Sequence, residues 1–106
     1  MQLHPENAIA VIFCALRTGG DEEGYQAAAK LMSALAAEQP GYLGQDNARS
    51  ADGMGITVSY WRDDASAKAW RDHPEHAVIR ERGRDQWYSA YTLHVARVER
   101  GYDWQK

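Results

Sequence analysis

The expected fold depends on the stretch AIAVIFCAL, residues 8–16. Alternate side chains of a β-strand point to opposite faces of a sheet, and in this stretch both alternating sets are apolar. Ile9 and Phe13 belong to one face, whereas Ile12 and Leu16 belong to the other. A strand of this kind has to be covered on both sides to keep its side chains from water. The sheet that contains it therefore needs a layer on each face.

The rest of the chain divides into helices and strands by its periodicity and its turn residues. Apolar residues at helical spacing follow a glycine turn, with Asp21 as the expected cap and a stop at residues 39–41. Asp63 is expected to cap a short helix, and Pro74 is expected to end it and to open the next helix, in which Gly83 is a weak point. Helices are thus expected at residues 21–39, 63–70 and 74–88, and strands at residues 8–16, 42–49, 55–61 and 90–99.

The order of these segments is β-α-β-β-α-β, which is the ferredoxin-like α+β arrangement with an antiparallel sheet. Its first and third strands are central, and its second and fourth strands lie at the edges. The polar residues 42–49 suit an edge, and the apolar residues 8–16 suit the centre. Helices can cover only one face of such a sheet. We therefore expect a second copy of the chain to cover the other face, in a homodimer that packs sheet against sheet.

Length and composition limit the classes of protein to which the chain can belong. Its 106 residues suit one domain, residues 1–106, with the core at residues 8–100 and a short aromatic tail at residues 101–106. Basic and acidic residues number 12 and 15, which disfavours nucleic acid as a partner, and no apolar run is long enough to span a membrane. The N-terminus lacks the basic start of a signal sequence, and the single Cys14 cannot form an internal disulfide, so a cytoplasmic location is expected.

Four segments of the chain together resemble one known family. They are QPGYLG at residues 39–44, GITVSYWRD at 55–63, AWRDHPEH at 69–76 and GRDQWY at 83–88. In these segments the sequence is similar to the antibiotic biosynthesis monooxygenase family, and the resemblance extends over residues 8–100. It implies a dimeric α/β barrel. Characterised relatives include cofactor-independent monooxygenases that act on aromatic polyketides, and haem-degrading monooxygenases.

The resemblance also implies a reaction and a site. The leading hypothesis is the oxidation of a small aromatic or enolisable molecule by O₂, with no metal and no cofactor expected. The expected catalytic residues are His76 as a base, Arg80 as an anion stabiliser and Trp70 as a wall of the pocket. An aromatic pocket between the sheet and the helices is expected to bind the substrate through Tyr60, Trp61, His73 and Trp87.

Each of these residues also has an ordinary structural interpretation. One histidine of the pair His73 and His76 can cap a helix while the other lies in solvent. Trp87 can pack in the core like any large aromatic residue, and Arg80 can belong to a charged, solvated helix face. The sequence alone leaves both interpretations open.

Two other functions also remain open on the sequence. Haem-degrading relatives carry an Asn on the first strand, a Trp at the position of Trp70 and a haem-ligating His. In this chain Phe13 or Cys14 replaces the Asn and Arg80 replaces the His, with His76 about one helical turn away as a substitute ligand. The third hypothesis is a dimer that binds a small molecule without catalysis, because one fold can serve many functions.

Overall fold

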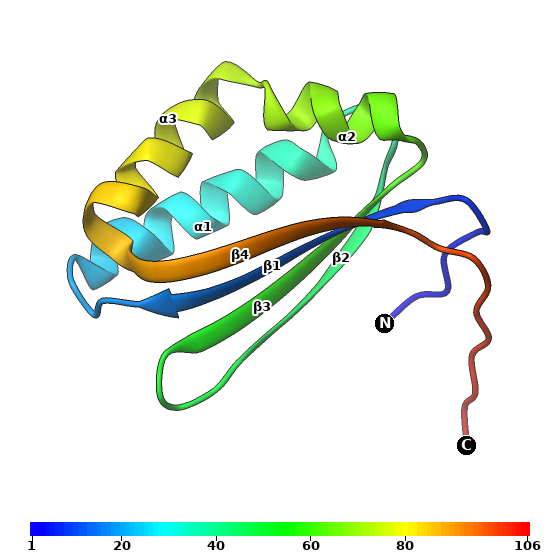
Figure 1. The fold of residues 1–106 in the computed structure, drawn as a ribbon, viewed down its shortest axis with the longest axis horizontal. Helices are drawn as coiled ribbons and strands as arrows, with labels where there is room; N and C mark the ends of the chain where they lie inside the picture. The colour runs from blue at the N-terminus through cyan, green and yellow to red at the C-terminus, as the bar shows by residue number, and fades with distance from the viewer.

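Four strands form one antiparallel sheet in the computed structural model, which describes residues 1–106 (Figure 1). The strands are β1 (Ile9–Arg17), β2 (Tyr42–Arg49), β3 (Met54–Trp61) and β4 (Tyr88–Arg97). Their order in the sheet is β2-β3-β1-β4, so β1 and β3 are central and β2 and β4 lie at the edges. The ferredoxin-like α+β fold expected from the sequence is therefore confirmed.

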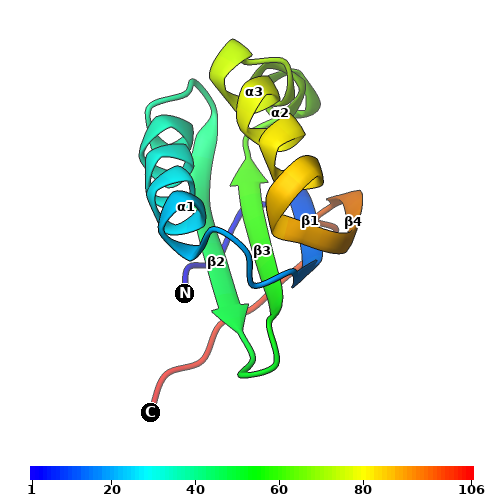
Figure 2. The same ribbon diagram turned by 90° about the vertical axis from the view of Figure 1, so that its left-hand side faces the viewer.

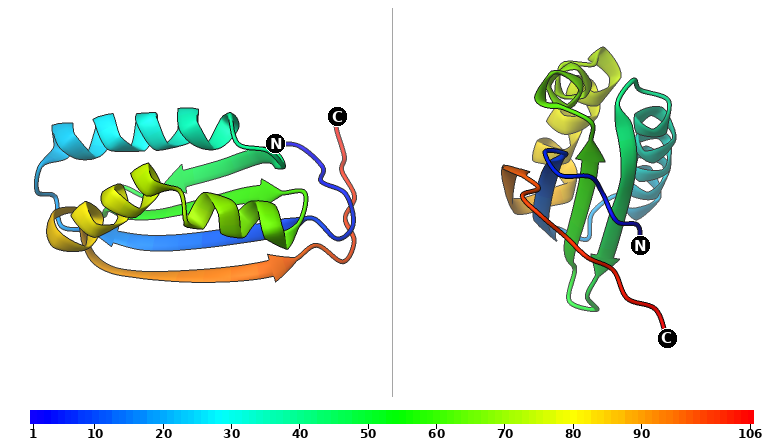
Figure 3. Two further views of the ribbon diagram at one scale, coloured as in Figure 1. Left: turned by 90° about the horizontal axis from the view of Figure 1, so that it is seen from above. Right: turned by 90° about the vertical axis from the view of Figure 1, so that its right-hand side faces the viewer.

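All the helices lie on one face of this sheet (Figures 1 and 2). They are α1 (Glu22–Ala37), α2 (Asp64–Arg71) and α3 (Pro74–Arg82), and one turn of π-helix, η1 (Gly83–Trp87), joins α3 to β4. Seen from above, α1 runs along the β2 side of the sheet, and α2 and α3 run along the side of β1 and β4 (Figure 3). We call this side of the sheet the helix-covered face and the other side the open face.

Local sequence explains where each helix begins. Asp21 caps α1, Asp63 caps α2 and His73 caps α3, and each side chain accepts a hydrogen bond from a backbone amide of the first turn. Pro74 occupies the first turn of α3, where it needs no amide hydrogen. The capping positions expected for Asp21, Asp63 and Pro74 are therefore present.

The helix that starts at Pro74 changes its character at Gly83. The α-helix ends at Arg82, and the five residues from Gly83 to Trp87 form a wider π-helical turn. A Cβ atom at Gly83 would lie only 2.8 Å from Cε2 of Tyr88. Gly83 is thus more than a weak point of the helix, because the absent side chain leaves room for the Tyr88 ring.

The core of the chain lies between the helices and the sheet. Trp61 is fully buried, and Ile9 and Trp70 are 3% and 8% exposed beside it. Small residues of the helices, Ala36 and Ala67, complete this cluster. The small alanine side chains let the helix backbones come close to the sheet. The large indole rings of Trp61 and Trp70 fill the space that remains between them.

The open face of the sheet carries no helix (Figure 2), and the side chains that its two central strands place there are apolar. Leu16, Met54 and Ile56 on this face remain between 37% and 44% exposed. The sheet is open at both edges and does not close into a barrel within one chain. None of the helices combines the length and the apolar character that crossing a bilayer requires. The strand that decided the expected fold, β1, is thus covered by helices on one face only, and on the other face Leu16 stays 44% exposed.

Candidate functional site

The seven residues expected at the site lie in three places. One group gathers where α2 meets α3 on the helix-covered face and consists of Trp61, Trp70, His73, His76 and Arg80. Trp87 lies at the other end of that face, beside the start of α1. Tyr60 lies on the open face. The structure therefore brings together the proposed base, the anion stabiliser and one aromatic wall, but separates them from Trp87 and Tyr60.

His76 is held against Trp70 in the first turn of α3. Its ring stacks on the indole, with centroids 4.5 Å apart and ring planes inclined by 18°. Its Nδ1 lies 2.9 Å from the backbone oxygen of Trp70. Because a carbonyl oxygen only accepts hydrogen bonds, Nδ1 carries the proton, and Nε2 holds the free lone pair of the neutral ring. The fold thus presents Nε2 as the basic atom.

The surroundings of His76 favour its neutral form. Burial lowers the pKa of His76 below its ordinary value of 6.5, and the positive charges of Arg80 and His73 act in the same direction. The hydrogen bond to the Trp70 carbonyl opposes these effects. The imidazole is therefore unprotonated at neutral pH and ready to accept a proton.

His73 and Arg80 both bind the backbone near His76. The His73 Nδ1 accepts the amide of Glu75, and its ring lies tilted beside Trp70, with centroids 5.5 Å apart. The Arg80 guanidinium donates to the backbone oxygen of Arg71 at 3.2 Å and forms no ion pair. Arg80 thereby ties the end of α2 to α3 and keeps a positive charge beside His76.

The three expected tryptophans are core residues in this chain. Trp61 and Trp70 stack with centroids 6.3 Å apart, and the Trp61 indole donates to Ser59 Oγ at 3.0 Å. Trp87 is 1% exposed, and its indole donates to Asp21 Oδ2 at 3.2 Å. These indoles hold the helices on the sheet, and Trp70 is 8% exposed, with His76 stacked on its ring.

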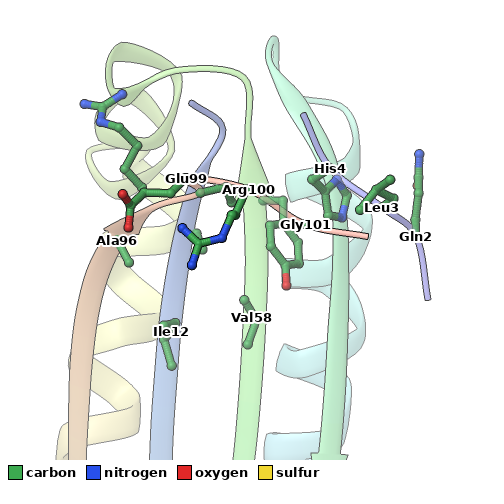
Figure 4. Close-up of a pocket in the computed structure, with 13 residues that line it drawn as sticks. Gln2, Leu3, His4, Ile12, Val58, Ala96, Glu99, Arg100 and Gly101 are labelled. Carbon is green, nitrogen blue, oxygen red and sulfur yellow. The ribbon is translucent and has the colours of Figure 1, made fainter. Parts of the chain in front are cut away.

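Tyr60 helps to form a concavity on the open face (Figure 4). The concavity measures about 640 Å³ and has an apolar floor of Ile12 and Val58. The N-terminal arm lies over one side, where His4 stacks on Tyr60 with ring centroids 3.8 Å apart. The segment after β4 lies over the other side and carries Arg100 toward the hollow (Figure 4). A planar molecule with a negative group suits this combination of surfaces.

A second group of polar residues on the helix-covered face was not predicted from the sequence. Arg17, Tyr25, Arg49 and Tyr88 meet where β1 ends and α1 begins. The direction of Arg17 could have been predicted, because Arg17 continues the alternating set of β1 side chains that faces the helices. The direction of Tyr88 could not, since it depends on a shift in strand register between Leu16 and Arg17.

Comparison with known sequences identifies a family and a close relative. A sequence model described as antibiotic biosynthesis monooxygenase matches residues 8–82. The chain is 47% identical over 91 residues to the uncharacterized protein YqjZ of Bacillus subtilis. The aligned region covers 86% of this chain and 79% of that protein.

Comparison with solved structures finds the same fold at low sequence identity. A variant of SnoaB, described as a cofactor-independent oxygenase from Streptomyces nogalater, matches with a TM-score of 0.77 and 13% identity, over 90% of this chain and 96% of that chain. Rv0793 from Mycobacterium tuberculosis matches with a TM-score of 0.78 and 15% identity, over 91% of this chain and 99% of that chain. At these identities the likeness concerns the fold alone.

Proposed function

The chain belongs to the antibiotic biosynthesis monooxygenase family, and from this membership we propose that it is a cofactor-independent monooxygenase-like enzyme that oxidises a small aromatic or enolisable molecule with O₂. The observation that carries the proposal is the arrangement of His76. Its imidazole is desolvated, its Nδ1 is fixed on a carbonyl oxygen and its Nε2 is free. A base of this kind deprotonates a phenol or an enol near neutral pH.

The proposed reaction begins with proton transfer from the substrate to Nε2 of His76. The resulting phenolate or enolate is electron-rich and gives one electron to O₂, which forms a substrate radical and superoxide. The two radicals combine at carbon, and the peroxide takes up a proton and loses water to give a carbonyl group. The positive charge of Arg80 beside His76 stabilises the anion at the first step, and Trp70 holds the imidazole of His76 in place by stacking on it.

Oxygen uptake tests this function. Purified protein is mixed with a panel of hydroxyanthrones and hydroquinones, and the rate is followed with an oxygen electrode. We expect turnover by the wild type and a loss of about 100-fold or more in His76→Gln, because general-base catalysis contributes that much. His94→Gln is the control, since His94 lies on β4 and is exposed. Rates equal to buffer for the whole panel, or equal rates in wild type and His76→Gln, would contradict the proposal.

We further propose that the chain forms a homodimer through its open face. The support is the set of apolar side chains that the central strands β1 and β3 place on this face. They are Ala10, Ile12, Cys14, Leu16, Met54, Ile56, Val58 and Tyr60. Removing this surface from water is favourable at about 25 cal/mol per Å². In such a dimer the concavity beside Tyr60 would become enclosed between two sheets.

Two of the three residues expected at a haem site are replaced in this chain. Arg80 stands at the position expected for the ligand, and a guanidinium that stays protonated cannot coordinate iron. Phe13, on the strand position of the family's Asn, packs edge-to-face on Tyr88 with centroids 5.4 Å apart. Titration with haemin should therefore leave the Soret band of free haemin unchanged, and a shifted, saturable Soret band would contradict this statement.

A non-catalytic binding dimer is the second candidate. It is favoured by the concavity on the open face, whose apolar floor and nearby Arg100 suit a ligand at a place remote from His76. Mass spectrometry of the purified protein under non-denaturing conditions tests it. A co-purified molecule that stays unchanged under air supports binding alone, whereas conversion of that molecule in air supports the enzyme.

A further inference from the structure

A buried arginine lies at the end of the helix-covered face that is remote from His76. The side chain of Arg17 is only 5% exposed, and its Nε is buried without any hydrogen-bond partner. Its guanidinium lies over the Tyr25 ring at 3.2 Å from the centroid, and its Nη2 donates to Glu22 at 2.7 Å. A buried donor without an acceptor is unfavourable, and more so when the group is charged. An unsatisfied donor of this kind points to an acceptor supplied from outside the chain.

A second guanidinium approaches the same place. The Arg49 guanidinium lies 5.0 Å from the centroid of the Tyr25 ring and donates a hydrogen bond to the Tyr25 hydroxyl. Arg49 forms no ion pair, so Glu22 is the one carboxylate that bonds either arginine. Glu22 bonds Arg17 alone, so the guanidinium of Arg49 has no bonded carboxylate and can bind one from a ligand.

The other groups at this place are also donors. The Tyr25 oxygen already accepts from Arg49, which leaves its own hydrogen available. Burial, together with the neighbouring Tyr25, raises the pKa of Tyr88, so this hydroxyl also keeps its hydrogen. Asp21, the nearby acidic residue at the start of α1, is engaged by the amide of Gly24 and by Trp87. Within this cluster the Nε of Arg17 is the buried donor without an acceptor.

We propose that Arg17 and Arg49, with the hydroxyls of Tyr25 and Tyr88, form a binding site for the carboxylate group of a small organic acid. A carboxylate is a planar monoanion whose two oxygens accept from guanidinium and phenol groups. The site is separate from His76 and does not depend on the oxidation proposed above. The start of α1 and the end of β1 build it at one end of the molecule (Figure 1).

NMR of the arginine side chains tests this site in the wild-type protein. Acetate is titrated at constant ionic strength while the Nε–H signal of Arg17 is followed, and acetamide serves as the uncharged probe of equal size. The signal is assigned by its loss in Arg17→Lys. We expect a saturable shift with acetate and none with acetamide. No saturable shift with acetate, or an equal shift with acetamide or with chloride, would overturn the proposal.

Two exposed arginines supply matched variants. Arg49→Gln removes one guanidinium from the site, and we expect it to weaken acetate binding by about tenfold or more, because a hydrogen bond to a charged group is lost. Arg62→Gln removes the same charge at the other end of the chain, where Arg62 pairs with Asp63, and should leave acetate binding unchanged. Equal weakening by both variants would show a general effect of net charge and would exclude the site. An affinity of Arg49→Gln equal to that of the wild type would exclude it as well.

Discussion

At the scale of single residues, His76 is distinguished by its surroundings. It is the histidine that combines stacking on a tryptophan, a fixed Nδ1 and a lowered pKa. His73 serves as a helix cap, and His4 stacks on Tyr60 on the open face. The same type of side chain thus performs different tasks, because the backbone groups and rings around each imidazole differ.

The lowered pKa of His76 predicts a loss of stability in mild acid. In the unfolded chain the imidazole binds a proton near pH 6.5, whereas the folded chain binds it only at lower pH. Below pH 6.5 the unfolded state therefore binds more protons, and the free energy of unfolding falls as the pH falls toward the folded pKa. Urea denaturation from about pH 8 to about pH 5 should show this slope in the wild type and a smaller slope in His76→Gln. An NMR titration midpoint of His76 above 6.5 would contradict it.

Replacing Gly19 or Gly41 by alanine should reduce the free energy of unfolding by different amounts, although the two glycines have similar backbone angles. Gly41 has φ +85° and would place a Cβ 2.1 Å from Ser66 Oγ, whereas Gly19 has φ +83° and open space around it. Gly19→Ala should lower the free energy of unfolding by about 1–2 kcal/mol, because alanine is strained at this positive φ. Gly41→Ala should lower it by more, since Ser66 is buried and must move. Chemical denaturation of both variants measures the difference, and equal losses would show that Ser66 yields freely.

At the scale of elements, the connection from α3 to β4 depends on the π-helical turn. The shift in register between β1 and β4 skips one residue near the start of β4. As a result Tyr88 and Tyr91 both face Phe13, with ring centroids 5.4 Å and 5.2 Å away. The turn and the register shift together direct two phenols to the helix-covered face.

Gly83 and Tyr88 should show a strong coupling in a double-mutant cycle. In a helix, alanine is normally more favourable than glycine by about 1 kcal/mol. A destabilising effect of alanine at Gly83 would therefore come from a steric clash. Gly83→Ala should destabilise the wild type, because the added Cβ collides with the Tyr88 ring. In the Tyr88→Ala background the same change should be neutral or stabilising. Free energies of unfolding from urea titrations give the coupling, and additive effects would show that the ring does not constrain Gly83.

At the scale of the whole molecule, the sheet divides the chain into a covered and an uncovered half. All helices lie on one face, and the two ends of the chain lie toward the other (Figures 1 and 3). The tail residues Tyr102 and Trp104 are 91% and 78% exposed. Large aromatic rings without neighbours in their own chain are typical of an interface, which agrees with the proposed dimer.

The open face predicts which substitutions should separate the dimer. Val58→Arg places a charge at the centre of the proposed interface, opposite Ile12 of the neighbouring strand. We expect it to shift the protein to a monomer at micromolar concentration, because a buried charge without a partner is strongly unfavourable. Val78→Arg is the control, since Val78 is 60% exposed on α3. Sedimentation velocity measures both variants, and a monomeric wild type would refute the dimer itself.

Much of the fold was predictable from local pattern. The alternation in residues 8–16 identified the central strand, and the polar residues 42–49 identified an edge. The site was less predictable. Trp70 lies at the end of α2 and His76 at the start of α3, and the short link between these helices keeps the two rings together, whereas Trp87 and Tyr60 lie elsewhere. Residues close in sequence stay close in space, but residues on different strands depend on register and on the face to which each points.

The sequence by itself determined the order of the strands, the positions of the helix caps and the need for cover on both faces of β1. These properties follow from periodicity and from single residues such as Asp21, Asp63 and Pro74, whose effects are local. Only the tertiary structure decided that Nε2 of His76 is the free nitrogen and that Arg17 and Arg49 meet over Tyr25. Such meetings arise from long-range packing and strand register, which no local pattern records.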